Sequence, residues 1–234
     1  MPVVFKSDIE AFKDEVERRG INRVVHFTPA INLISIYEQG SILSREQLKK
    51  LTVEYPQLHL EDYVEVNDRL RLDNLNDYIN LSIQHPNYYL FKKFRNSCKN
   101  WCDSWCVISL NPECLWYEST LFSIGNAASS VSKEFGINGK YTTFLSLFQD
   151  NLISGNINHQ TVLSRKGIKD YHPTDVQAEV LVKGQISTEC ISEVFFETQE
   201  EASRFRAAIS LTVNTKLPPF TVNSNLFIGD RNNG

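Results

Sequence analysis

A single carboxylate, Glu179, stands between a polar loop and an apolar run in the stretch HPTDVQAEVLVKG, residues 172–184. A purely structural interpretation makes this an edge strand whose alternate side chains, Gln177, Glu179 and Lys183, face water. A chemical interpretation makes Glu179 a reactive group that the strand holds in place. The stretch alone favours neither interpretation.

His26 lies at the end of the apolar pattern VVHF, and Thr28 and Asn32 follow where the next helix is expected to start. Polar side chains at such a junction line the crevice at the strand's end, where the hydroxyls of a ribose find donors and acceptors. The alternative is a core histidine, with Thr28 capping the helix. The segment therefore gives a candidate nucleotide pocket beside a plain structural alternative.

Two arginines, Arg69 and Arg71, lie in the polar segment VNDRLRLDNLNDYINLSI, just before an expected strand. A guanidinium group binds phosphate oxygens in pairs and keeps its charge, so either arginine would suit a pyrophosphate. A solvated turn with salt bridges explains the same composition equally well.

The sequence lacks the glycine-rich phosphate loops of dinucleotide and nucleoside-triphosphate enzymes, which disfavours a Rossmann dehydrogenase or a kinase-like enzyme. Cys98, Cys102 and Cys106 recur every four residues and would stack along one face of a helix. A structural zinc site usually needs four ligands in paired clusters, so we expect these thiols to be small buried hydrophobes and expect no metal.

The chain has 234 residues, of which 41% are hydrophobic, and this fits one globular domain spanning 1–234. A formal net charge of -4 gives no long-range attraction to nucleic acid, so such a partner would need a local basic surface. The start of the chain turns polar within a few residues, and the five cysteines suit a reducing compartment. We therefore expect a cytoplasmic protein.

Hydrophobic periodicity predicts the elements that must position these residues. Helices are expected over 7–20 behind Ser7 as N-cap, from about 29 to a stop at Gly40, after Ser44, over 88–96 and over 199–210. Strands are expected at NRVVHFT, DYINLSI, WCVISL, AEVLVKG and ISEVFFET. The polar composition of 138–170 predicts a long connection, and about 215–234 reads as a terminal strand or extended tail.

The order of these elements predicts the fold class. Crossover helices do not separate the strands at regular intervals. We therefore expect an α+β domain whose central, mostly antiparallel sheet is flanked by helices.

Three segments in order, RVVHFTPAINLISIYEQGSI, RLRLDNLNDYINLSIQHPNYYLF and VQAEVLVKGQIS, resemble in spacing the DarT family of DNA ADP-ribosyltransferase toxins. The resemblance covers about residues 21–200 and rests on the ordered set rather than on any one element. It implies an ADP-ribosyltransferase-like fold with a split sheet. It also implies that the protein takes NAD as co-substrate and transfers ADP-ribose to a base in single-stranded DNA.

Carried over position by position, the resemblance makes Glu179 the catalytic carboxylate that stabilises an oxocarbenium-like centre. His26 would hold a ribose of NAD, with Thr28 and Asn32 lining the same pocket. Either Arg69 or Arg71 would contact the pyrophosphate and assist catalysis, and we favour Arg71 because Asp73 could orient it. Gln177 takes the position two before the catalytic Glu, where this enzyme class often meets the acceptor.

The resemblance also assigns an acceptor-recognition loop at about 162–178. The residues expected to contact nucleic acid are Gln177, Arg165, Lys166, Lys169, Tyr171 and His172, joined by Lys92, Lys93 and Arg95. The cationic ones would meet phosphates, and Tyr171 and His172 would stack on a base. This would supply the local basic surface that an acidic protein needs.

The strand and turn DYINLSIQHPNYYLF depart from the aromatic DYVPFYF…RSPM pattern of many members, so the chain resembles a divergent branch. Known members modify thymine or guanine, and the HPNYY version resembles the guanine-directed branch, which implies guanine as the acceptor base. RNA stays open as an acceptor, because recognition of the 2′-hydroxyl cannot be seen in a sequence. A non-catalytic binding module and an NAD glycohydrolase stay open as functions, and the resemblance implies a cognate antitoxin that reverses or blocks the modification.

Overall fold

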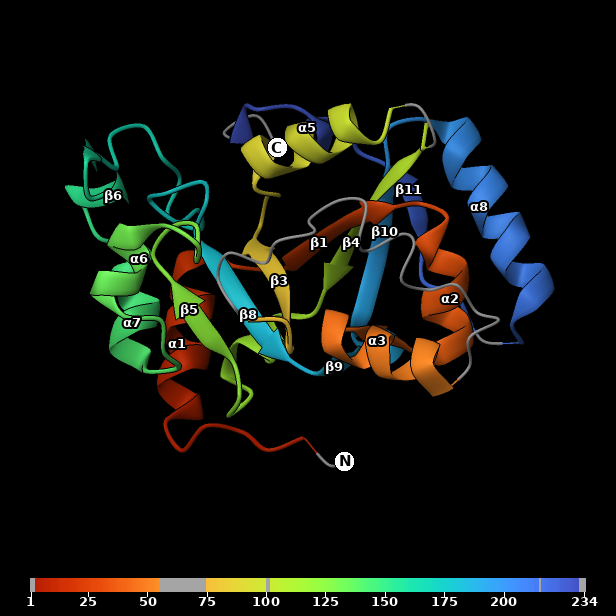
Figure 1. Cartoon of the computed structure of the whole chain (residues 1–234), viewed down its shortest axis with the longest axis horizontal. Coiled ribbons are helices and arrows are strands. Elements are labelled where there is room, and N and C mark those ends of the chain that lie inside the picture. Colours follow the sequence, from red (N-terminus) through yellow and green to blue (C-terminus); the bar gives the residue numbers. More distant parts are fainter. Residues whose placement is uncertain (1–2, 55–74, 100–101, 215, 232–234) are drawn as a thin grey trace.

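A computed structural model describes residues 3–54, 75–99, 102–214 and 216–231, and Figure 1 shows their arrangement. Within these residues, seven strands form one central sheet, and helices pack around it. The strands are β1 (Val24–Pro29), β3 (Tyr78–Ile83), β4 (Trp105–Leu110), β5 (Leu121–Ser123), β8 (Glu179–Lys183), β10 (Ile191–Phe196) and β11 (Phe220–Val222).

The sheet has the order β11-β10-β4-β1-β3-β8-β5, and every neighbouring pair is antiparallel except β10 and β11. β1 pairs with β4 along its whole length, but with β3 only at Val24↔Ile83 and Val25↔Ser82. The sheet therefore opens between β1 and β3 beyond Val25. The expected α+β fold with a split, mostly antiparallel sheet is confirmed.

The described helices are those that the periodicity placed, together with two short ones, over 130–135 and 141–146, that were not expected. They are α1 (Ile9–Arg19), α2 (Asn32–Gln39), α3 (Arg45–Glu54), α5 (Tyr88–Ser97), α6 (Ser130–Phe135), α7 (Tyr141–Ser146) and α8 (Gln199–Thr212), with short 3-10 turns η2 (Pro112–Trp116), η3 (Thr188–Cys190) and η4 (Ser224–Phe227). Gly40 ends α2 at φ 67°, a left-handed backbone that glycine adopts without strain. Thr198 and Glu201 form a capping box at the start of α8.

Two apolar clusters hold the helices to the sheet. Phe12 of α1 is fully buried and packs against Phe122 of β5 and Phe144 of α7. In the second cluster, the ring of Phe91 of α5 stacks on the ring of Phe27 of β1, with the ring centroids 4.6 Å apart. Aromatic packing therefore holds α1 and α7 to β5, and α5 to β1.

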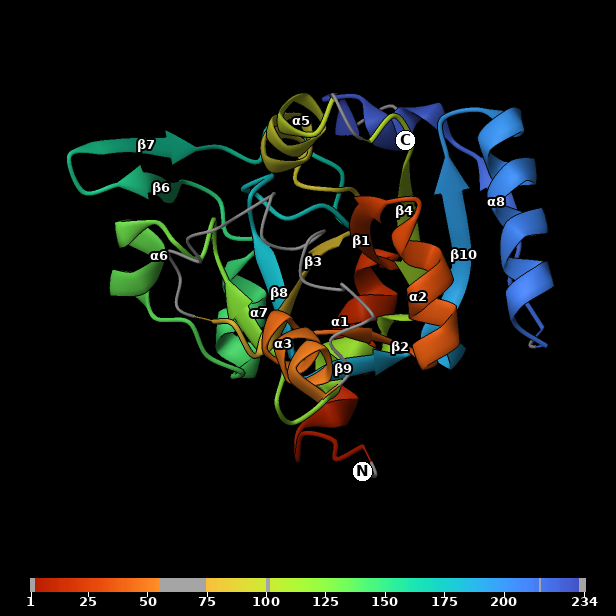
Figure 2. The same cartoon turned by 45° about the vertical axis from the view of Figure 1, so that its right-hand side comes forward.

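Some local expectations were wrong. Ser7 does not cap the first helix, since Asp8 is its N-cap residue. The segment 138–170 is not one long connection, because it contains α7 and the hairpin β6 (Leu152–Asn156) and β7 (His159–Leu163), which projects at one side of the molecule (Figure 2). Outside the central sheet, β2 (Ser41–Leu43) also pairs antiparallel with β9 (Gln185–Ser187), which is distant in the sequence.

The cysteines do not stack along a helix, because Cys98 ends α5 and Cys106 lies in β4. Both thiols are fully buried, as expected of small hydrophobes. The C-terminal segment is part of the domain, since β11 pairs in parallel with β10. None of the described helices is long and apolar enough to cross a membrane.

Candidate active site

A cavity of about 480 Å³ lies where β1 and β3 separate. Five of the residues chosen from the sequence line it together: His26, Thr28, Asn32, Lys93 and Glu179. Residues from α2, α3, α5 and the loop before α6 complete the wall, among them Arg45 and Asn126. The cavity has the size range in which proteins enclose small organic ligands, roughly 300–1,000 Å³.

Glu179 is the first residue of β8, and β8 is an interior strand between β3 and β5. The edge-strand interpretation is therefore wrong, and the carboxylate is only 4% exposed. Its Oε2 accepts a hydrogen bond from Asn80 Nδ2 at 3.1 Å and another from the Ala127 N–H at 3.3 Å. Burying a carboxylate is unfavourable unless such donors surround it, so these two bonds fix its place.

His26 lies across the split from Glu179, on β1. Its Nδ1–H donates to the backbone oxygen of Asn80 at 3.0 Å, so Nε2 is the acceptor nitrogen of the neutral ring. Burial lowers the pKa of His26, which keeps the ring neutral at pH 7. A neutral imidazole of fixed tautomer can accept a hydrogen bond from a ligand hydroxyl.

Thr28 and Asn32 are joined by a hydrogen bond from Asn32 Nδ2 to Thr28 Oγ1 at 2.8 Å. Thr28 does not cap α2, because Ile31 is the N-cap residue and makes no side-chain cap bond. The capping alternative is therefore wrong, and both polar groups lie on the cavity wall. Arg69 and Arg71 lie outside the described residues.

Asn80 of β3 was missed by the sequence reasoning, although it joins the two halves of the site. It donates to Glu179 through its side chain and accepts from His26 through its backbone. The available signal was an amide inside the expected strand, between the apolar residues Ile79 and Leu81.

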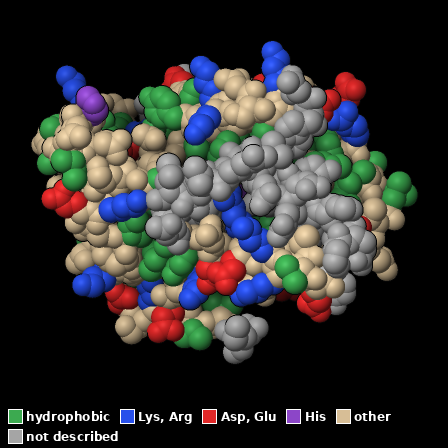
Figure 3. Space-filling view, in the orientation of Figure 1, with side chains coloured by type: hydrophobic (Ala, Val, Ile, Leu, Met, Phe, Trp, Pro, Cys, Tyr) green, Lys and Arg blue, Asp and Glu red, His purple; other side chains and the backbone are tan. Residues whose placement is uncertain are grey.

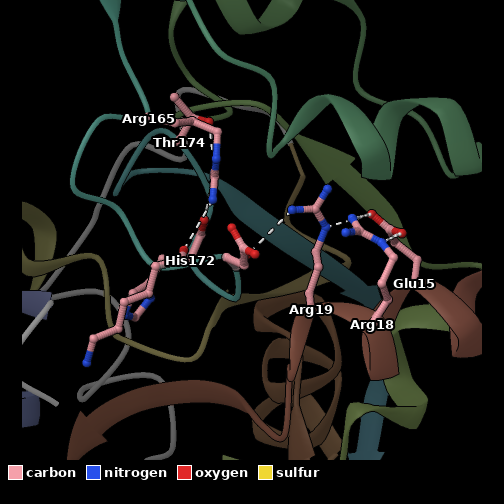
Figure 4. A network of polar contacts seen from close by, with 8 residues as sticks. Glu15, Arg18, Arg19, Arg165, His172 and Thr174 are labelled. Carbon is pink, nitrogen blue, oxygen red and sulfur yellow. Dashed lines mark hydrogen bonds and ion pairs between the residues drawn. The ribbon is translucent and has the colours of Figure 1, made fainter.

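The loop before Glu179 is held by arginines, as Figure 4 shows. Arg165 donates to the His172 oxygen at 3.0 Å, to Thr174 Oγ1 at 3.1 Å and to the Lys169 oxygen at 3.2 Å. From outside the loop, Arg19 donates to the Asp170 oxygen at 3.3 Å. The Arg165 guanidinium is thus used within the loop.

Arg231, near the C-terminal end of the described chain, forms hydrogen bonds with the same loop. It donates to the oxygens of Pro173 and Thr174 at 2.7 and 3.0 Å, and its own oxygen accepts from His172 Nε2 at 2.7 Å. His172 is only 3% exposed, so its ring is not presented for stacking on a base. Gln177 follows this anchored stretch, and its N–H donates to Asp175 Oδ1 at 2.8 Å.

The other Lys and Arg side chains expected to contact nucleic acid are either exposed or held in an ion pair. Lys166 and Lys169 of the loop and Lys92 and Lys93 of α5 are exposed, and Lys93 also lines the cavity. Arg95 instead forms an ion pair with Glu197 at 2.6 Å. Figure 3 shows Lys and Arg side chains along the upper edge of this face, where α5 lies in Figure 1.

Buried neutral histidines make stability depend on pH. Burial lowers the pKa of His172 from its ordinary 6.5 to about 4. Between these values the unfolded chain binds more protons than the folded one, so the free energy of unfolding falls as the pH drops from about 6.5 to about 4. A shift of this size corresponds to roughly 3 kcal/mol for His172.

Urea unfolding at a series of pH values checks this expectation. His172→Gln should flatten the pH dependence of the unfolding free energy in this window. An unchanged slope in the variant would mean that folding does not lower the pKa of His172.

A mostly antiparallel sheet that opens along one strand pair, over a cavity lined by a neutral histidine and a buried glutamate, has an ADP-ribosyltransferase-like fold. The comparisons with known proteins agree. A family model described as "DarT: ssDNA thymidine ADP-ribosyltransferase, DarT" matches residues 25–228. The chain therefore belongs to the DarT family and is an NAD-dependent single-stranded DNA ADP-ribosyltransferase.

Solved structures share the fold at low sequence identity. Thermus sp. 2.9 DarT in complex with NAD+ is 10% identical, with a TM-score of 0.56 over 89% of this chain and 98% of that one. The same protein in complex with ADP-ribosylated ssDNA is 12% identical, with a TM-score of 0.57 over 89% of this chain and 97% of that one. Thermosipho africanus DarTG in complex with ADP-ribose is 20% identical, with a TM-score of 0.55 over 88% of this chain and 51% of that one. Curated protein sequences give no significant match.

Proposed function

We propose that the protein is a toxin-type enzyme that transfers ADP-ribose from NAD to a guanine or thymine base in single-stranded DNA and releases nicotinamide. The observation that carries the proposal is the placement of Glu179 and His26 on opposite sides of the split sheet, at one cavity and both bound to Asn80. NAD supplies the ADP-ribose, and a solved DarT holds NAD+.

The proposed chemistry has one bond broken and one formed. The bond between C1′ of the ribose and the nicotinamide nitrogen breaks, and nicotinamide leaves with the electron pair. Glu179 stabilises the positive charge that develops on the ribose and binds a ribose hydroxyl. A nitrogen of the acceptor base then attacks C1′ and loses its proton. His26, Thr28 and Asn32 hold NAD, and Arg71 or Arg69 binds the pyrophosphate.

The DNA strand is proposed to run over the loop and α5. Lys166 and Lys169, with Lys92 and Lys93, meet the phosphates, and Tyr171 and Gln177 face the acceptor base. For Arg165, His172 and Arg95 we propose a supporting role instead, because each already contacts the protein itself, within the loop, at Arg231 and at Glu197. The proposed basic surface is therefore smaller than the one expected from the sequence.

A cognate antitoxin is the further partner that we propose, most simply an enzyme that removes ADP-ribose from the modified base. The Thermosipho africanus DarTG, which shares the fold, was solved in complex with ADP-ribose. NAD and transiently single-stranded DNA meet in the cytoplasm, so we propose that the protein acts there.

A panel of oligonucleotides tests the proposed function. Single-stranded DNA of each base composition, the matching RNAs and double-stranded DNA are incubated with the protein and NAD, and products are weighed by mass spectrometry. We expect one added ADP-ribose on guanine-containing or thymine-containing single-stranded DNA and no transfer to duplex. Modification of RNA alone would make the protein an RNA enzyme, and nicotinamide release without any modified oligonucleotide would make it a glycohydrolase.

A further inference from the structure

Asn80 uses both its side chain and its backbone within the site. Its Nδ2–H donates to Glu179 Oε2 at 3.1 Å, across 99 positions of the sequence. Its backbone oxygen accepts from His26 Nδ1 at 3.0 Å. One residue of β3 therefore touches the carboxylate on one side of the split and the imidazole on the other.

The register of the sheet makes this contact a rigid one. Asn80 pairs with Leu181 of β8, which puts the Asn80 side chain diagonally next to Glu179 on the same face of the sheet. The neighbours Ile79 and Leu81 point the other way and are 4% and 2% exposed. β3 is thus anchored in the core on both sides of Asn80, so the amide has little freedom to move away.

Two donors converge on the same oxygen of Glu179, the Asn80 amide and the Ala127 N–H at 3.3 Å. Donors to a carboxylate favour its ionised form and fix its rotation. The Nδ1–H bond of His26 to the same residue fixes the tautomer of the ring. Because both contacts come from Asn80 of β3, the Glu179 carboxylate and the His26 ring keep fixed positions relative to each other.

We propose that Asn80 is a positioning residue: its amide orients the Glu179 carboxylate, while its backbone oxygen holds His26 in the tautomer that accepts at Nε2. The role rests on the proposed function, in which Glu179 stabilises the reacting ribose. Asn80 acts through Glu179 and His26, and its amide binds neither the acceptor base nor the DNA strand.

The first variant is Asn80→Leu, which keeps the volume and the backbone oxygen but removes the amide donor. We expect kcat for nicotinamide release and for DNA modification to fall roughly tenfold, with the KM for NAD within about twofold of the wild type. The melting temperature should stay near that of the wild type. Asn22→Leu, at an exposed asparagine just before β1, is the matched control and should leave kcat unchanged.

The second variant, Asn80→Asp, gives a signature that a merely structural role would not produce. Two adjacent carboxyl groups share a proton, so the pKa of one of them rises. While that proton is held, the new acid can donate to Glu179 in place of the amide. We therefore expect Asn80→Asp to be least active at alkaline pH and to recover as the pH falls, whereas Asn80→Leu keeps a pH profile without such recovery.

The two proposals fail in different ways. If the wild type modifies no oligonucleotide, the proposed function fails. If the wild type transfers ADP-ribose and Glu179→Gln does not, but Asn80→Leu keeps full kcat, only the role of Asn80 is overturned. An Asn80→Asp profile parallel to that of the wild type overturns it as well, because the side chain would then have no influence on the carboxylate.

Discussion

Replacing Glu179 with glutamine should reduce ADP-ribose transfer by about two to three orders of magnitude, the usual effect of removing a group that stabilises charge in a transition state. Glutamine has the same shape, and its oxygen can still accept from Asn80 and from the Ala127 N–H. The fold should therefore survive, while the negative charge beside the ribose is lost. Single-turnover measurements of nicotinamide release and of modified oligonucleotide would give both rates.

Glu189→Gln is the matched control, because Glu189 is an exposed carboxylate in η3, away from the cavity. It should leave both rates unchanged. If Glu179→Gln transferred ADP-ribose at the wild-type rate, the buried carboxylate would serve packing alone. The protein would then need another residue to stabilise the reacting ribose. A variant that binds NAD and DNA normally but is inactive would separate loss of chemistry from loss of binding.

Local pattern was enough to predict the strand that carries Glu179, but not its place in the sheet. Alternation of Gln177, Glu179 and Lys183 suggested an edge strand, yet Val180, Leu181 and Val182 are all buried. A continuous apolar run is what an interior strand requires, since both of its faces are covered. That signal was present in the sequence beside the alternation, and a local pattern does not decide between the two.

Long-range contacts set the limit of sequence reasoning at this site. Asn80 meets Glu179 across 99 positions, and Arg231 meets Thr174 across 57. Neither spacing follows a helical or strand period, so no local rule brings those residues together. The basic composition of the loop was read correctly, but composition does not tell whether Arg165 faces DNA or the backbone of its own loop.

Replacing Arg165 with alanine should reduce DNA modification about a hundredfold, because a displacement of the reacting groups by about 1 Å is enough for such a loss. The change removes the guanidinium bonds to the oxygens of His172 and Lys169 and to the hydroxyl of Thr174, in the stretch that leads to Gln177 and Glu179. In Arg165→Ala, the rate of ADP-ribose transfer to single-stranded DNA should therefore fall more than the rate of nicotinamide release measured without DNA. Limited proteolysis should show faster cleavage within the loop.

The salt dependence of DNA binding distinguishes this role from a phosphate contact. Each lost phosphate contact lowers the slope of log affinity against log salt by about one, as we expect for Lys166→Ala and Lys169→Ala. Arg165→Ala should leave the slope unchanged, since its guanidinium is occupied within the loop. Arg206→Ala, an arginine on α8, should change neither the slope nor the rate. If the slope for Arg165→Ala fell by about one and proteolysis of the loop did not increase, Arg165 would be a phosphate contact of the DNA-binding surface.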